Sequence, residues 1–242
     1  MTDAIRISMW SGPRNISTTM MRAFGNRADT IVVDEPFYAC YLRASGTDHP
    51  HREETLAALP TDWREARAAL AAPLPPARSI RFAKHIAYHY PDAEPLDWLG
   101  TERSFILIRD PGRMIASFAK KFDDIAPIVD SYRVCRRVFD HCIDLGLPCP
   151  VVDAADILAD PRRLLAALCA ALSIPYTELM LSWPVGSRAS DGPWAPHWYD
   201  AVNASTGFRK AQETPLELDA ALRPLAALAE PDYRFFREKR IR

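Results

Sequence analysis

The sequence lacks three features that would assign it to familiar classes of protein. Its five cysteines are an odd number without a C-x-x-C pair, which gives no sign of a disulfide framework or a zinc site. No apolar run approaches the length of a membrane helix, about 18 residues, and no cleavable signal is apparent. The formal net charge of −1 gives no reason to expect nucleic acid or an anionic membrane as a partner. We therefore expect a soluble cytoplasmic protein with reduced thiols, in which any anion site is local.

The chain nevertheless has enough hydrophobic residues to form a folded core. With 242 residues, 48% of them hydrophobic, the chain can bury a substantial interior, and we expect one domain over residues 1–242. Short apolar runs alternate with helical patterns between residues 4 and 172. This order predicts an α/β fold, a three-layer sandwich with a central parallel sheet of about five strands. The predicted strands are Ile5–Met9, Thr30–Asp34, Ser79–Lys84, Ser104–Ile108 and Cys149–Asp153.

Three regions depart from this alternation. Residues 43–78 contain short alanine-rich helical patterns that end in prolines, which indicates an inserted helical cover. Residues 183–210 form a loop with three tryptophans, which is either a lid or a segment fixed to the sheet by those side chains. Leu216–Leu228 is predicted to be a last helix, kinked near Pro224, and Arg234–Arg242 a solvated basic end.

The first predicted strand leads directly into a possible anion site. A tight turn at Ser11-Gly12-Pro13 separates the strand from a helix that opens near Ile16, and Asn15 or Ser17 is available as its N-cap. The first backbone N–H groups of a helix have no internal partner, and the helix dipole adds positive charge there. Arg14 adds a full charge, and hydroxyl groups fill the first turn. The alternative is an ordinary helix start with a capping serine.

This loop is not the usual nucleoside triphosphate loop. When G-x-x-x-x-G-K-[ST] is placed on the chain from Gly12, Ser17 takes the position of the second glycine and Thr18 that of the lysine. The lysine that reaches the β- and γ-phosphates is therefore missing. An NTP-dependent phosphotransferase, with magnesium on Ser17 or Thr18, remains the runner-up.

Acidic and basic residues follow the next two strands. Asp34 and Glu35 stand at the end of a predicted strand, on the sheet edge where ligands of doubly wound proteins bind. Asp34 is interpreted as a structural partner, whereas Glu35 is either a catalytic carboxylate or another such partner. Lys84 and His85 end the third strand, and His85 is either a base or the partner of a carbonyl group. His49-Pro50-His51 lacks a third ligand nearby, so no metal is assigned there.

A second possible anion site follows the fourth strand. Arg109 comes directly after a buried apolar run, and Ser117 lies eight residues further on, in a predicted helix that covers Gly112–Lys121. An arginine at a strand end and a serine on the next helix can form an oxyanion pocket. The alternative is that Arg109 pairs with Asp110 and that Ser117 faces water.

The two loops together resemble motifs of the sulfotransferases that use 3′-phosphoadenosine 5′-phosphosulfate (PAPS). Gly12–Thr19, GPRNISTT, resembles the 5′-phosphosulfate loop of that family, roughly G-x-R/K-S-G-T-T, with Asn15 and Ile16 in place of the usual Ser-Gly. Phe105–Lys120 is similar to the family's 3′-phosphate motif. The wider pattern WSGPRNIST…VVDEPFY looks like a bacterial sulfotransferase-like subgroup that is poorly defined by substrate.

The resemblance implies a fold like that of the P-loop NTPases and a sulfuryl-transfer reaction. A sulfuryl group would move from PAPS to a hydroxyl or amine of an unidentified small molecule, leaving adenosine 3′,5′-bisphosphate (PAP), with no metal required. It implies Glu35 as the base, with His85 as the alternative, and Arg14 as the group that stabilises the leaving phosphate. A non-catalytic nucleotide-binding relative remains possible. The residues implied to bind the donor are Arg14, Asn15, Ile16, Ser17, Thr18, Thr19, Arg109 and Ser117.

Overall fold

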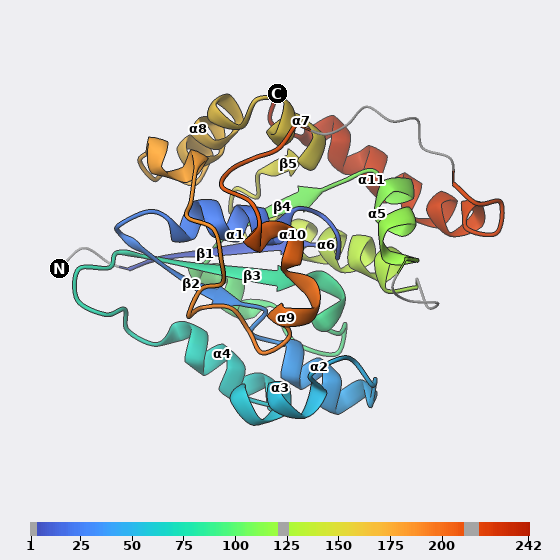
Figure 1. The fold of residues 1–242 in the computed structure, drawn as a ribbon, viewed down its shortest axis with the longest axis horizontal. Helices are drawn as coiled ribbons and strands as arrows, with labels where there is room; N and C mark the ends of the chain where they lie inside the picture. Colours follow the sequence, from blue (N-terminus) through green and yellow to red (C-terminus); the bar gives the residue numbers. More distant parts are fainter. Residues whose placement is uncertain (1–3, 121–125, 211–217) are drawn as a thin grey trace.

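A five-stranded parallel sheet forms the centre of the molecule. The computed structural model describes residues 4–120, 126–210 and 218–242. The strands lie side by side in the order β2-β3-β1-β4-β5, all parallel, with helices on both faces (Figure 1). The predicted α/β class and parallel sheet are confirmed. The strand bounds are β1 Ile5–Ser11, β2 Thr30–Asp34, β3 Ile80–Ile86, β4 Arg103–Ile108 and β5 Val151–Asp153.

The strand order places the binding edge at the end of β1. This strand lies between β3 and β4, so the chain order reverses on either side of it, and such a switch point is where open α/β sheets bind ligands. The strands end level, because Ser11 pairs with Ile86 on β3 and with Leu107 on β4. The loops that follow these strands therefore meet at one edge.

Alternating side chains build one hydrophobic cluster on each face of the sheet. Met9 and Phe82 pack with α1 (Ser17–Gly25) and α8 (Pro161–Ala171) on one face. On the other face, Trp10 and Ala83 pack with α6 (Ala126–Asp144) and α11 (Arg223–Lys239). This alternation explains why neighbouring residues of one strand reach different environments. The remaining helices are α2 Tyr38–Ser45, α3 Arg52–Ala58, α4 Trp63–Ala71, η1 Ala87–His89, η2 Asp97–Thr101, α5 Pro111–Phe118, α7 Ala154–Ala159, η3 Glu178–Leu181, α9 Ala195–Trp198 and α10 Asp200–Asn203.

Helices α2, α3 and α4 lie together on the β2 side of the molecule (Figure 1). They form the helical cover that was predicted for residues 43–78, although it begins earlier, at Tyr38. No helix of the described residues is both long and apolar enough to cross a membrane.

A last helix is present as predicted, but its predicted bounds were wrong, and so was the description of the basic end as solvated. Residues 216 and 217 lie outside the described part of the chain, and the last helix begins only at Arg223, with Pro224 in its first turn. A proline is tolerated there because the first N–H groups of a helix lack partners in any case. The basic end is not simply solvated, because Phe236 is fully buried and the Ile241 N–H donates to the Val151 carbonyl at 2.9 Å. Charged residues stand between the apolar residues of this helix in the sequence, so its buried apolar face was not recognised.

Candidate functional site

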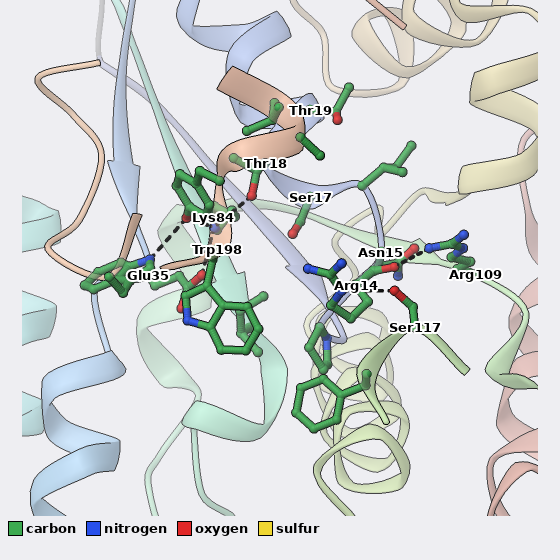
Figure 2. Close-up of a pocket in the computed structure, with 18 of the residues that line it drawn as sticks. Arg14, Asn15, Ser17, Thr18, Thr19, Glu35, Lys84, Arg109, Ser117 and Trp198 are labelled. Atoms are coloured by element: carbon green, nitrogen blue, oxygen red, sulfur yellow. Dashed lines mark hydrogen bonds and ion pairs between the residues drawn. The ribbon is translucent and has the colours of Figure 1, made fainter. Parts of the chain in front are cut away.

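The predicted ligand edge contains a pocket of about 350 Å³, which we call the edge pocket. It is lined by the loop after β1, by Glu35 after β2, by the end of β3 and by Arg109 after β4. Figure 2 shows Glu35 and Lys84 on one side and Arg14, Ser117 and Arg109 on the other, with Ser17 and Trp198 between them. Side chains from four strand ends therefore converge on one space.

The loop after β1 holds two residues in the left-handed backbone region. Arg14 has a φ of 60° and Ile16 a φ of 52°, conformations that cost L-residues about 1–3 kcal/mol each and that persist only where surrounding contacts fix them. One such contact is the buried Asn15 side chain, whose Nδ2 donates to the Leu107 carbonyl at 2.6 Å. Turned backbone of this kind presents successive N–H groups to one side, where an anion can bind.

The predicted cap of α1 was wrong. Neither Asn15 nor Ser17 is the N-cap, because Ile16 takes that position in the left-handed conformation. An isoleucine side chain cannot accept a hydrogen bond, and among the described residues no side chain caps this helix. The first-turn N–H groups, at Ser17, Thr18 and Thr19, are therefore not occupied by a protein cap, and these residues line the edge pocket.

Two arginines meet beside this helix end. The Arg14 Nε donates to Ser117 Oγ at 3.1 Å, and an Arg109 guanidinium nitrogen donates to the Arg14 carbonyl at 2.5 Å. Burial lowers the pKa of both guanidinium groups, and the nearby charges of Arg113 and Arg14 lower the pKa of Arg109 further. Guanidinium groups stay charged in proteins, so these half-buried like charges favour an anion between them. The Asp110 carboxylate caps α5 by accepting from the Arg113 N–H at 2.9 Å.

A buried network of carboxylates surrounds Lys84 on the other side of the pocket. The Lys84 ammonium, 1% exposed, lies 2.8 Å from Asp34 Oδ1 and 2.8 Å from Glu35 Oε1. Burial alone would lower the pKa of Lys84, but the two carboxylates raise it well above its usual value. The Tyr199 hydroxyl donates to Asp34 at 2.7 Å, and the Gly192 N–H donates to it at 3.1 Å. Asp34 is thus a structural partner of buried groups, as the sequence indicated.

Glu35 differs from Asp34 because it faces the pocket. Its φ of 42° turns the chain sharply, while its N–H donates to the Lys84 carbonyl at 2.9 Å and extends the β2–β3 pairing. Burial raises the pKa of the Glu35 carboxyl to about 7, against the opposing attraction of Lys84. A carboxylate with a pKa near the working pH is suited to take a proton from a bound molecule.

The structure does not bring His85 to the edge pocket. His85 and Lys84 are neighbours on β3, so their side chains lie on opposite faces of the sheet. The buried His85 ring stacks on Trp10 with 4.3 Å between ring centroids, and its Nε2 lies 3.2 Å from Ser8 Oγ. Two other histidines line the pocket, His49 and His89. The strand pattern could not single out His89, because a short 3₁₀ turn, η1, brings it back to the edge.

The tryptophan segment, residues 183–210, is fixed to the body of the protein. Trp183 and Trp194 are buried in the same cluster as α1, and both Trp194 and Trp198 line the edge pocket. Arg22 of α1 forms two hydrogen bonds with Asp191, at 2.6 and 2.8 Å, and both side chains are buried. Of the two interpretations of this segment, these contacts favour the one in which it is held to the sheet.

We expect Asp34→Asn to lower the free energy of unfolding by about 3 kcal/mol. Three buried donors, from Lys84, Tyr199 and Gly192, meet the Asp34 carboxylate, and an amide has only one oxygen to accept from them. The measurement is urea denaturation. The matched control is Asp92→Asn, whose exposed carboxylate pairs with Arg133 and Arg137, and it should change stability by less than about 1 kcal/mol. Equal stability of the two variants would mean that Asp34 does not hold Lys84 in place.

Comparison with known proteins identifies the family from the sequence and the fold from solved structures. A family model described as a sulfotransferase domain matches residues 5–239. Among solved structures, the sulfotransferase domain of the Synechococcus PCC 7002 olefin synthase superposes with a TM-score of 0.53 and 16% identity, covering 96% of this chain and 95% of that one. A sulfotransferase from Alicyclobacillus acidocaldarius gives a TM-score of 0.54 and 14% identity, covering 97% and 95%. At these identities the superpositions establish the fold alone.

A curated relative is more similar in sequence but much longer. "Branched-chain-amino-acid aminotransferase-like protein 2" of Arabidopsis thaliana is 34% identical over 209 residues, which are 86% of this chain but 37% of that protein. The chain thus spans little more than a third of the length of that relative. Its printed name describes the whole plant protein, and the name gives no ground for assigning aminotransferase chemistry to this chain.

Proposed function

We propose that this protein, which belongs to the sulfotransferase domain family, transfers a sulfuryl group from PAPS to a small-molecule acceptor and releases PAP. The observation that carries the proposal is the meeting of Arg14, Arg109 and Ser117 beside the uncapped start of α1, all in one pocket. PAPS carries anionic groups on both its 5′ and 3′ positions. Arg14 and Arg109, which are joined by a hydrogen bond, can each bind one of these two anionic groups.

In the proposed complex each anion has its own partners. The phosphosulfate lies against the first turn of α1, with the Arg14 guanidinium and the hydroxyls of Ser17 and Thr18 around it. The 3′-phosphate lies against Arg109 and Ser117. Arg14 donates to Ser117 directly, so the two subsites are adjacent, as the two ends of one nucleotide require. Figure 2 shows Arg14 with Ser117 and Arg109 beside it.

The reaction is an in-line transfer. The acceptor oxygen attacks sulfur, and a new sulfur–oxygen bond forms while the bond between sulfur and the 5′-phosphate oxygen breaks. The electron pair of the broken bond stays on that phosphate oxygen, whose charge Arg14 and the helix N–H groups stabilise. The acceptor proton passes to Glu35, which later returns it to water. The products are a sulfate ester of the acceptor and PAP.

The test of the function is direct. The purified protein is incubated with PAPS and a set of small hydroxyl compounds and amines, and PAP release and product mass are measured. Transfer with PAPS supports the proposal. Stabilisation by ATP with magnesium but not by PAP would instead support a phosphotransferase, and PAP binding without transfer to any acceptor would indicate a non-catalytic relative.

We expect Arg109→Ala to weaken PAP binding by about 10- to 100-fold, because a charge-assisted hydrogen bond contributes about 1.5–3 kcal/mol. Isothermal titration measures the affinity. The exposed Arg133 of α6 provides the matched control, Arg133→Ala, which should bind PAP normally.

A second ligand separates phosphate recognition from damage to the loop. Adenosine 5′-phosphate lacks the 3′-phosphate, so Arg109→Ala should change its affinity little. If the variant loses affinity for both nucleotides equally, Arg109 supports the Arg14 backbone and does not read the 3′-phosphate.

A further inference from the structure

His89 has no assigned part in binding the donor, and its surroundings set it apart from the other buried histidine. It is 4% exposed and lines the edge pocket, yet neither of its ring nitrogens has a hydrogen-bond partner among the described residues. Its ring stacks on Tyr38 with 4.5 Å between centroids and on Tyr41 with 4.8 Å. The ring is thus held in place while its polar atoms are left unused. Buried polar atoms without protein partners are uncommon in proteins, and in a pocket they are available to bind a ligand.

The carboxylate of Glu35 lies close to His89. Lys84 lies against Glu35 Oε1 at 2.8 Å, whereas Oε2 lies 3.6 Å from His89 Nδ1. This separation exceeds a hydrogen bond, so the two atoms do not satisfy each other. One small polar group placed beside both atoms would satisfy both. Burial lowers the pKa of His89 well below its usual value, so the imidazole is neutral and carries one N–H and one acceptor nitrogen.

We propose that Glu35 and His89 together hold the nucleophile of the acceptor, and that this nucleophile is a hydroxyl group on a flat apolar body. The inference rests on the proposed function, because it assigns the acceptor side of the same pocket. The hydroxyl donates its proton to Glu35 Oε2 and accepts a hydrogen bond from the His89 Nδ1–H. A neighbouring carboxylate favours the tautomer that has its proton on Nδ1.

The number of lone pairs distinguishes a hydroxyl group from an amine at this position. A hydroxyl oxygen has two lone pairs, so one accepts from His89 while the other attacks sulfur. A neutral amine nitrogen has a single lone pair, and a hydrogen bond from His89 would occupy the pair that must attack. His89 therefore selects hydroxyl acceptors over amines of the same shape.

The lining of the pocket supports the second half of the proposal. Tyr38, Tyr88, Trp194 and Trp198 all contribute to the edge pocket, and aromatic rings bind flat apolar groups by stacking and edge contacts. Lys84 supplies one positive charge for the two carboxylates of Asp34 and Glu35. This side of the pocket consequently has a surplus of negative charge, which disfavours an anionic group on the acceptor.

The experiment compares two probes of nearly equal shape, 2-naphthol and 2-naphthylamine, with PAPS as donor. The wild-type protein should bind 2-naphthol in the presence of PAP and should sulfonate it. His89→Phe keeps a ring for stacking but removes both nitrogens. This variant should lower kcat/KM for 2-naphthol by roughly tenfold, the effect of one lost buried hydrogen bond. It should not lower kcat/KM for 2-naphthylamine, whose lone pair no longer meets the His89 N–H.

Two further variants make the result specific. His89→Asn places an amide N–H close to the position of Nδ1 and should retain most of the activity towards 2-naphthol. The matched control is His141→Phe on α6, outside the edge pocket, which should leave both reactions unchanged. PAP affinity should be the same in all variants, because His89 lies on the acceptor side.

The remaining outcomes overturn the inference. If His89→Phe lowers kcat/KM equally for 2-naphthol and 2-naphthylamine, His89 supports the structure of the pocket and does not contact the acceptor hydroxyl. If PAP binds but neither naphthalene binds, or if both bind and neither is sulfonated, the assignment of a flat hydroxyl acceptor is wrong while the donor site stands. If PAP itself does not bind, the proposed function fails first.

Discussion

Glu35→Gln should reduce turnover by about 100- to 10,000-fold, the range that general-base catalysis contributes, while PAP affinity stays unchanged. Glutamine has nearly the same shape, but it cannot take the proton of the acceptor. The Lys84 ammonium keeps its contact with Asp34, so the buried charge is not left without a partner. The measurement combines steady-state turnover with titration of PAP. Glu65→Gln, on the exposed surface of α4, is the matched control.

The pH dependence of the wild-type reaction checks the same assignment. Burial raises the pKa of Glu35 to about 7. Because the base works only when ionised, kcat/KM should rise with pH up to about 7, level off above it, and fall roughly tenfold per unit below it. Lys84, with its raised pKa, stays charged through this range, and His89, with its lowered pKa, stays neutral. A profile without a change near 7, or full turnover in Glu35→Gln, would assign the base to another group.

Arg14→Ala should reduce kcat by about 100- to 1,000-fold, the usual cost of removing one preorganised donor from a site of developing negative charge. Arg14→Lys should recover part of this loss, because a lysine restores the charge but not the planar fork of donors. Single-turnover measurements at saturating PAPS separate this effect from weaker donor binding.

The backbone at Arg14 supplies a control for misfolding. Glycine adopts the observed φ of 60° without steric cost, so Arg14→Gly removes the guanidinium and leaves the loop relaxed. This variant should be as inactive as Arg14→Ala and should melt close to the wild-type protein. An active Arg14→Gly variant would contradict the proposed contact with the leaving phosphate.

The sheet could be predicted from the sequence because each strand carries its own signal. Thr30–Asp34 was predicted with the bounds that it has in the structure, and the run at Ser104–Ile108 differs from β4 by one residue. Short β-branched or apolar runs between helical patterns depend on local composition, which a single sequence displays. The C-terminal helix could not be predicted in the same way, because its bounds are set by packing of Phe236 against the β-sheet core.

The site was predictable where a residue directly follows a strand. Glu35 and Arg109 follow β2 and β4, so the common edge of a parallel sheet brings them together. His89 could not be singled out, because β3 continues to Ile86, two residues beyond its predicted end, and the turn η1 then brings His89 back to the edge. The contact of Arg14 with Ser117 and the pairing of Lys84 with two carboxylates also depend on tertiary packing, which spacing along the chain does not encode.

The central claim, that one nucleotide bridges Arg14 and Arg109, is tested most directly by thermal unfolding with PAP compared with ATP plus magnesium. PAP at 100 times its dissociation constant should stabilise the protein by about 2.7 kcal/mol, and ATP with magnesium should have much less effect. Equal stabilisation by the two nucleotides, or stabilisation by ATP with magnesium alone, would contradict a donor site built for a 3′-phosphate.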